Sequence, residues 1–252
     1  MSRKTIDILG VQVDSIEFEK AVDVAESLMK SEKTSMIFTP NPEIIMCAKD
    51  DGELRSILNA ADLCTADGIG VVYASRIMGK PVPERVAGFD VVCALLERAA
   101  KSGTGVFLFG AKPGVAEIAK KNLEEKHPGI KIVGTHDGYF KEEDEADIVT
   151  QINESGAQLL LVCLGAPKQE KWIAKHKDEL NVNLCMGVGG TLDVLAGTAK
   201  RAPKLFIRLN LEWFYRLLKQ PTRIGRMMVL PKFILVVKKD KKEKAKLERK
   251  KK

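Results

Sequence analysis

The stretch QLLLVCLGAPKQE, residues 158–170, decides the fold class of this chain. Residues 158–164 form a short, mostly apolar run of the kind found in parallel strands that are buried on both faces. The run ends at Leu164, and the residues that follow it, 165–170, are small or polar. The pattern predicts a buried strand followed by a loop at the edge of a sheet.

Similar apolar runs recur up to about residue 199 and alternate with stretches of helical periodicity, which indicates an α/β fold. The other expected strands are 6–13, 35–39, 62–65, 105–109, 130–134 and 183–188, and the clearest helices are 15–30, 89–101, 115–126 and 142–155. We therefore expect a Rossmann-like, layered, mostly parallel sheet with helices on both faces, followed by a basic amphipathic helical appendage.

The positive charge of the chain is concentrated at its C-terminal end. The formal net charge of the 252 residues is +7, but residues 1–199 carry 22 basic and 30 acidic side chains, whereas residues 200–252 carry 19 basic and 4 acidic ones. This asymmetry favours an anionic partner for the C-terminal part, either membrane phosphates or nucleic acid. The expected organisation is an α/β domain over 1–199, an appendage over 200–237 and a disordered polybasic tail over 238–252.

The appendage has the pattern of a membrane-surface segment. Residues 204–219 predict one amphipathic helix with a basic stripe and an apolar stripe. The apolar residues 227–237 are too few to span a bilayer and are interrupted by Pro231. No secretory signal precedes the domain, and the five cysteines show no CxxC spacing, so we expect a cytoplasmic protein attached peripherally to the membrane.

Chemistry in open α/β sheets gathers beyond the carboxyl ends of the strands. Junctions of small or polar residues follow five of the expected strands, at 39–43, 66–68, 110–114, 165–170 and 187–193. The glycines at 110 and 187 either turn the chain or let backbone N–H groups cradle a diphosphate. Neither junction matches GxGxxG.

Asp67 is the sharpest candidate for catalysis. A carboxylate that follows an apolar strand, between Ala66 and Gly68, can serve as a general base. The alternative is an N-cap for a helix over 69–78, because aspartate is a favoured capping residue. Apart from the pair Asp50 and Asp51 and the acidic run 142–147, no clustered carboxylate motif for Mg²⁺ or Mn²⁺ is present, so we expect no metal or other cofactor.

Two other classes of protein fit the pattern less well. A nucleic-acid-binding protein would explain the basic end, but the acidic body and the lack of an RNA or DNA motif argue against it. A Rossmann-type dehydrogenase would need GxGxxG after an early strand and an acidic residue about 20 positions later, which this chain lacks.

Four motifs together give a more specific indication: TPN at 39–41, ADG at 66–68, GAPKQE at 165–170 and GVGGTLD at 187–193. With these motifs in this order, residues 5–230 resemble the WecG/TagA/CpsF family of bacterial glycosyltransferases. The likeness is greatest to the TagA branch, which builds the linkage disaccharide of wall teichoic acid. The resemblance implies transfer of N-acetylmannosamine from UDP-N-acetylmannosamine to N-acetylglucosamine on undecaprenyl diphosphate, with inversion and without a metal. The alternative donor is UDP-N-acetylmannosaminuronic acid or another UDP-hexose.

The resemblance also implies roles for individual residues. Asp67 would be the base, and Thr39 and Asn41 would orient the sugar. The residues expected to line the UDP pocket are Gln169, Glu170, Gly189, Gly190 and Asp193, with Arg85 as a further phosphate contact. Without a metal, guanidinium groups would balance the charge on departing UDP, and Arg216, Arg223 and Arg226 fit that task; simple lipid contact is the alternative. Family members tend to self-associate, so the resemblance also implies a homo-oligomer.

Overall fold

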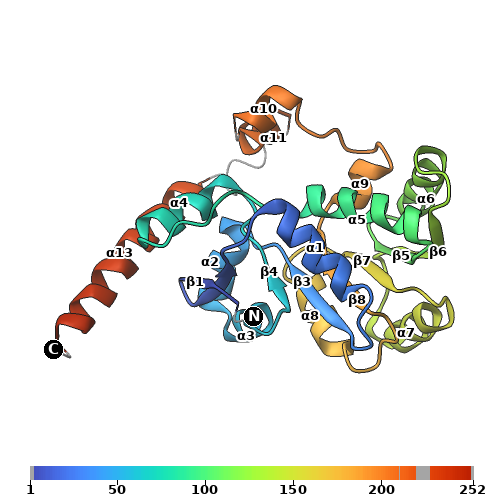
Figure 1. The fold of residues 1–252 in the computed structure, drawn as a ribbon, viewed down its shortest axis with the longest axis horizontal. Helices are drawn as coiled ribbons and strands as arrows, with labels where there is room; N and C mark the ends of the chain where they lie inside the picture. Colours follow the sequence, from blue (N-terminus) through green and yellow to red (C-terminus); the bar gives the residue numbers. More distant parts are fainter. Residues whose placement is uncertain (1–2, 210, 220–227, 251–252) are drawn as a thin grey trace.

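The core of the protein is a single sheet of six parallel strands in the order β4-β3-β8-β7-β5-β6. The computed structural model describes residues 3–209, 211–219 and 228–250. Figure 1 shows the strands side by side in this order, with β4 at one edge and β6 at the other. The strands are β3 (Ser35–Phe38), β4 (Leu63–Cys64), β5 (Gly105–Gly110), β6 (Lys131–His136), β7 (Leu159–Cys163) and β8 (Leu184–Gly187). The expected Rossmann-like α/β fold is confirmed.

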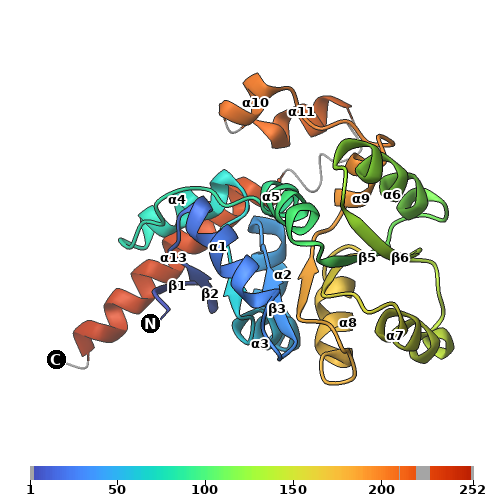
Figure 2. The ribbon, with the colours of Figure 1, turned by 45° about the vertical axis from the view of Figure 1, so that its right-hand side comes forward.

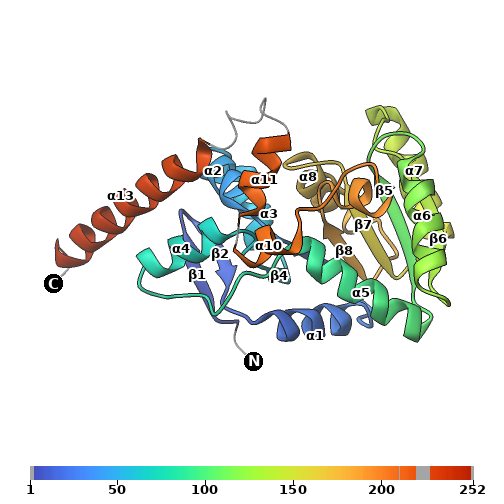
Figure 3. The same cartoon turned by 90° about the horizontal axis from the view of Figure 1, so that it is seen from above.

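Helices bury both faces of this sheet. Side chains of β7 alternate between two cores, with Leu160 and Val162 in one and Leu159 and Leu161 in the other. The helices that cover the second core are α1 (Phe18–Leu28), α5 (Gly88–Ser102), α6 (Val115–Lys126) and α9 (Thr191–Leu195). Those that cover the first are α2 (Pro42–Asp50), α3 (Gly52–Asn59), α4 (Ile69–Ile77), α7 (Glu145–Glu154, preceded by the 3₁₀ turn η1, Glu142–Asp144) and α8 (Lys168–His176). Figure 3 shows α1 and α5 on one side of the strands and α8 on the other.

The N-terminal strand expected over 6–13 is a hairpin. Strands β1 (Thr5–Ile8) and β2 (Val11–Asp14) pair antiparallel, and Leu9 and Gly10 form the two-residue turn between them. Both turn residues have positive φ, 55° and 90°, as a type I′ turn requires. A leucine at the first of these positions gives little sequence signal for a turn, because turns of this type usually carry Asn, Asp or Gly there.

The appendage begins with two short helices instead of the single helix expected over 204–219. Helix α10 (Lys204–Arg208) ends before Leu209, and α11 (Glu212–Lys219) begins three residues later. The break lets α11 turn back, so that the rings of Phe206 and Tyr215 lie 5.4 Å apart. Contact between these aromatic side chains favours the paired helices over one straight rod. Figure 2 shows α10 and α11 together above the α/β body.

The last described element, α13 (Val229–Lys250), is one continuous helix. Pro231 lies in its first turn, where no backbone N–H is needed. Phe233 and Val237 are fully buried in the core beside α2 and α4, and Lys244 Nζ lies 2.5 Å from Asp7 Oδ1 of β1. Helix α13 includes residues 238–250 of the segment expected to be a disordered tail, and it lies beside α4 in Figures 1 and 3.

Gly70 of α4 is the point of closest approach between α2, α4 and α13. A Cβ atom there would lie 2.5 Å from Leu230 Cδ1 of α13 and 2.6 Å from Pro42 Cγ of α2. We expect Gly70→Ala to lower the free energy of unfolding by about 1–3 kcal/mol, because the added methyl overpacks this junction. Urea unfolding followed by circular dichroism measures the change.

The matched control is Gly52→Ala in α3, where the new Cβ would be 3.6 Å from its nearest neighbour, Arg55 Nη2. This variant should be neutral or slightly stabilising, because alanine restricts the unfolded chain more than glycine does. Equal unfolding free energies for the two variants would contradict the tight junction at Gly70.

Candidate active site

The five polar junctions lie at one edge of the sheet. Because all six strands are parallel, their carboxyl ends point the same way. The junctions follow β3, β4, β5, β7 and β8, and these five strands are adjacent in the sheet. The structure therefore brings together segments that are up to 150 residues apart in the chain.

Thr39 and Asp67 lie on either side of Gly88, the first residue of α5. The backbone N–H of Gly88 donates to Asp67 Oδ2 at 3.3 Å, and the N–H of Asp67 donates to the Pro40 carbonyl at 3.3 Å. A Cβ at Gly88 would lie 2.5 Å from Thr39 Oγ1, so only glycine allows this close approach. The ends of β3 and β4 and the start of α5 thus hold the threonine and the aspartate together.

The capping alternative applies to Asn41 rather than to Asp67. Asn41 is the N-cap of α2, and its Oδ1 accepts from the Ile44 N–H at 3.0 Å. The N-cap of α4 is Gly68, and no side chain caps that helix. The Asp67 side chain therefore does not cap α4, and its Oδ2 accepts instead from the N–H of Gly88 at the start of α5.

Arg85 lies beside Asp67 in a cluster of charged side chains that sequence patterns did not indicate. Its guanidinium makes an ion pair with Glu212 of α11 and lies 3.6 Å from Asp90 of α5. Burial disfavours the charged guanidinium, but the hydrogen bond and charge of Glu212, together with Asp67 and Asp90, raise the pKa of Arg85. Arg85 is therefore held in place by carboxylates of the protein itself.

Gln169 and Glu170 support the glycine turn after β8 from behind. Gln169 Oε1 accepts from the Gly189 N–H at 2.9 Å, and Gln169 Nε2 donates to Glu170 Oε1 at 2.9 Å. Both side chains are buried, and Glu170 Oε2 has no hydrogen-bond partner among the described residues. Burial raises the pKa of Glu170. Of this group, Gly190 is exposed and Gly189 and Asp193 are half-buried, so these three lie at the surface of the turn.

A third part of the site surrounds the end of β5. A Cβ at Gly110 would lie 2.4 Å from the Cys163 carbonyl oxygen of β7, and the Ala111 N–H donates to that oxygen at 3.0 Å. The Gly138 N–H donates to the Ala111 carbonyl at 2.9 Å, which places Tyr139, 67% exposed, next to this loop. The chain continues from β5 to β6 on one side of the sheet and from β7 to β8 on the other side. The loop after β5 therefore lies at a topological switch point.

Tyr139 is a candidate that sequence analysis missed. The signal was an aromatic residue shortly after an expected strand, but aromatic residues in loops are too common to stand out. Its position became informative only when the structure showed an exposed ring at the carboxyl edge of the sheet.

Comparison with known proteins decides the family. Residues 6–247 match the family model described as "Glycosyl transferase WecG/TagA/CpsF family". The chain belongs to this family of glycosyltransferases. Curated relatives named N-acetylglucosaminyldiphosphoundecaprenol N-acetyl-beta-D-mannosaminyltransferase include proteins of Bacillus spizizenii, 37% identical over 93% of this chain and 92% of the relative, and of Bacillus subtilis strain 168, 40% identical over 83% and 81%. A protein of Staphylococcus aureus strain MW2 with the same name is 36% identical over 94% of both chains.

Three arginines expected to act in this glycosyltransferase belong to the appendage. Arg216 lies in α11, one turn after Glu212, and its backbone alone is described. Arg223 and Arg226 lie outside the described residues. Within 3–209, 211–219 and 228–250, no group of three or more His, Cys, Asp or Glu side chains could hold a metal ion.

The raised pKa of Glu170 predicts a pH-dependent stability. The folded state keeps a proton on this carboxyl to higher pH than the unfolded chain, whose glutamates titrate near pH ~4.3. Its contribution to stability therefore falls as the pH rises above that value. Glu170→Gln removes the titration and keeps an oxygen for Gln169 Nε2, so we expect this variant to be more stable than the wild type near neutral pH.

Urea unfolding at neutral pH and below the pKa of free glutamate tests this. The gain from Glu170→Gln should shrink at the lower pH, because both forms are then uncharged. A gain of the same size at both pH values would contradict a buried, protonated Glu170.

Proposed function

We propose that this glycosyltransferase moves N-acetylmannosamine from UDP-N-acetylmannosamine to N-acetylglucosamine on undecaprenyl diphosphate, with inversion and without a metal ion. The observation that carries the proposal is the position of Asp67 at the carboxyl edge of β4, where Gly88 at the start of α5 holds its carboxylate beside Thr39. The relatives match most of this chain, and their names contain the transferred sugar, N-acetylmannosamine, and the acceptor, so they support these two parts of the proposal. The product is then the linkage disaccharide of wall teichoic acid.

In the proposed reaction, Asp67 accepts the proton of the acceptor 4-hydroxyl. The hydroxyl oxygen forms a bond to the anomeric carbon while the bond from that carbon to the UDP oxygen breaks, and UDP departs with the bonding electrons. Attack from the face opposite UDP inverts the anomeric configuration. Thr39 and Asn41 orient the sugar for this attack, and correct orientation of the reacting groups raises the rate.

UDP is proposed to bind across β5, β7 and β8. The switch point between β5 and β7 is where nucleotides bind in related α/β sheets. In this proposal, Gly110 lets backbone N–H groups approach the diphosphate of UDP closely. The exposed ring of Tyr139 offers a surface on which the base can stack. Gly189, Gly190 and Asp193 lie on the adjacent turn. Gln169 and Glu170 act in this scheme as supports of the turn.

The negative charge that develops on UDP needs a counter-charge. Guanidinium groups are the proposed source, namely Arg216, Arg223 and Arg226. All three follow α10 in the appendage, so in this proposal the appendage completes a site whose base lies in the α/β domain. Arg85 as a direct phosphate contact stays a prediction.

Asp67→Asn tests the proposed base. The amide cannot accept the proton, so kcat should fall about 10²- to 10⁴-fold, while UDP binding, measured by calorimetry, should be nearly unchanged. The assay combines a panel of UDP-sugars, a short-chain lipid-diphosphate N-acetylglucosamine acceptor and a chelator, and identifies the disaccharide by mass and linkage.

The control is Asp50→Asn, because Asp50 is an exposed carboxylate at the end of α2 that pairs only with Lys49 among the contacts described. Near-normal turnover by Asp67→Asn would refute the base. Loss of wild-type turnover in the chelator would refute metal independence.

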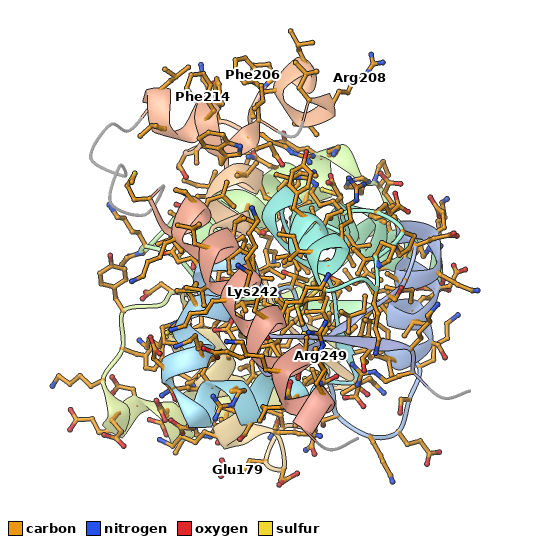
Figure 4. The ribbon with its side chains drawn as sticks, turned by 90° about the vertical axis from the view of Figure 1, so that its left-hand side faces the viewer. Glu179, Phe206, Arg208, Phe214, Lys242 and Arg249 are labelled. Carbon is orange, nitrogen blue, oxygen red and sulfur yellow. The ribbon has the colours of Figure 1, made fainter. Side chains whose placement is uncertain are left out.

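We also propose that the appendage attaches the enzyme to the inner face of the cytoplasmic membrane. Large apolar side chains are exposed on α10, on α11 and just after α10, and these are Leu205, Leu209, Trp213, Phe214 and Leu218. Figure 4 shows Phe206, Arg208 and Phe214 along the outer edge of these helices, and Lys242 and Arg249 on α13. Apolar and basic groups together favour binding to an anionic bilayer surface. No described helix is long and apolar enough to cross a membrane.

Replacing Lys242 and Lys246 of α13 with glutamine tests the attachment. Each lysine near an anionic surface contributes about 1 kcal/mol, so binding to vesicles rich in phosphatidylglycerol should weaken about 30-fold. The same two-charge change at Lys121 and Lys126 of α6 is the control and should have little effect. Tighter binding to oligonucleotides than to vesicles at physiological salt would contradict the proposal.

A further inference from the structure

Four charged side chains join the appendage to the α/β domain beside Asp67. Arg85 pairs with Glu212 and lies 3.6 Å from Asp90, while Arg201 Nη2 lies 2.6 Å from Asp90 Oδ1 and its Nε lies 3.8 Å from Glu212 Oε1. The guanidinium of Arg201 also lies over the ring of Phe89, 4.5 Å from its centroid. We call Arg85, Asp90, Arg201 and Glu212 the clasp.

The members of the clasp come from separate parts of the chain. Arg85 precedes α5, and Asp90 lies in its first turn. Arg201 lies between α9 and α10, and Glu212 is the first residue of α11. Glu212 and Arg85 are 127 residues apart, so their ion pair is a contact between the appendage and the catalytic edge of the sheet.

The clasp differs from an ordinary surface salt bridge. An isolated exposed pair contributes little to stability because water and salt screen it. Here the side chains of Arg85 and Glu212 are only 15% and 16% exposed, and the two positive and two negative groups form one network. Removing one charge would leave its partner partly buried and uncompensated, which is costly.

The position of the clasp suggests what it does. Asp90 lies in the first turn of α5, two residues after Gly88, whose N–H donates to Asp67 Oδ2, so the clasp borders the proposed base. Arg216 follows Glu212 by one helical turn, so fixing Glu212 fixes the helix that carries Arg216. Helix α11 has eight residues, which is too short to be stable in water without such contacts.

We propose that Glu212 is a positioning residue, whose ion pair with Arg85, completed by Asp90 and Arg201, docks α11 beside Asp67 so that the appendage can complete the active site. Glu212 itself does not touch the substrate. The effect on rate rests on the proposed function, whereas the docking of α11 does not.

The kinetic test compares Glu212→Gln with the wild type. The amide has nearly the same shape but no charge, so α11 shifts and kcat falls about 100-fold, as a displacement of about 1 Å can cause. The donor KM should change far less, because groups that act mainly in the transition state affect kcat. Glu212→Asp keeps the charge with a shorter reach and should recover part of the loss. Glu154→Gln, an exposed carboxylate at the end of α7, is the control and should leave kcat unchanged.

A second test measures docking without any substrate. The chain has two tryptophans, Trp172 in the core and Trp213 next to Glu212. In a Trp172→Phe background, Trp213 is the only tryptophan, and acrylamide quenching of its fluorescence reports how well α11 is covered. Glu212→Gln should increase the quenching constant, and Glu154→Gln should not.

The outcomes separate this inference from the proposed function. Absence of any product from the wild-type enzyme would defeat the proposed function and leave the quenching comparison to judge docking. Unchanged quenching and unchanged kcat in Glu212→Gln would overturn the clasp. A rise in kcat or in UDP affinity would also overturn it, because Glu212 would then be a carboxylate that blocks Arg85 from a phosphate.

Discussion

The parallel pairing of six strands, buried on both faces, is the constraint on which the rest of the structure depends. Because the strands are parallel, their carboxyl ends all lie at one edge of the sheet, and so do the residues that follow each strand. Two close approaches tighten this arrangement: Gly88 against Thr39, and Gly110 against the Cys163 carbonyl. A side chain at either glycine would push apart the strand ends that hold the site. The polar junctions therefore converge because of sheet geometry, and they need little further interaction among themselves.

Much of this could be predicted from the sequence, because buried parallel strands leave continuous apolar runs. The runs near Ser35, Gly105 and Leu159 each correspond to a strand within one or two residues of the expected ends. The hairpin at Leu9 and Gly10 was hidden because Leu9 is apolar like its neighbours Ile8 and Val11, so the first turn residue gave no turn signal. Asp67 was a capping candidate for the helix that follows it, and only backbone geometry showed that Gly68 occupies that N-cap position.

Contacts between distant segments were beyond reach for a different reason. The break after α10 depends on the contact between Phe206 and Tyr215, and the order of α13 depends on Phe233, Val237 and Lys244 finding partners in the domain. Local patterns of charge and hydropathy show which face of a helix can be buried, but they do not show which distant segment will pack against that face. For the same reason, the polybasic segment 238–252 was expected to be disordered. Phe233 and Val237, which precede it, pack in the core, and helix α13 continues from them to Lys250.

Two of the contacts between the appendage and the α/β domain lie on elements that carry the proposed active site. Leu230 of α13 packs at Gly70 against Pro42, in the first turns of the helices that follow Asn41 and Asp67. Glu212 of α11 pairs with Arg85 on the segment that leads to Gly88, which in turn donates to Asp67. In the proposed mechanism, guanidinium groups of the appendage act in place of a metal, and they must then be held relative to the proposed base. The appendage is anchored to the same short segments that fix Asp67. This meets the need, because the helices of the appendage and Asp67 then keep their relative positions when either moves.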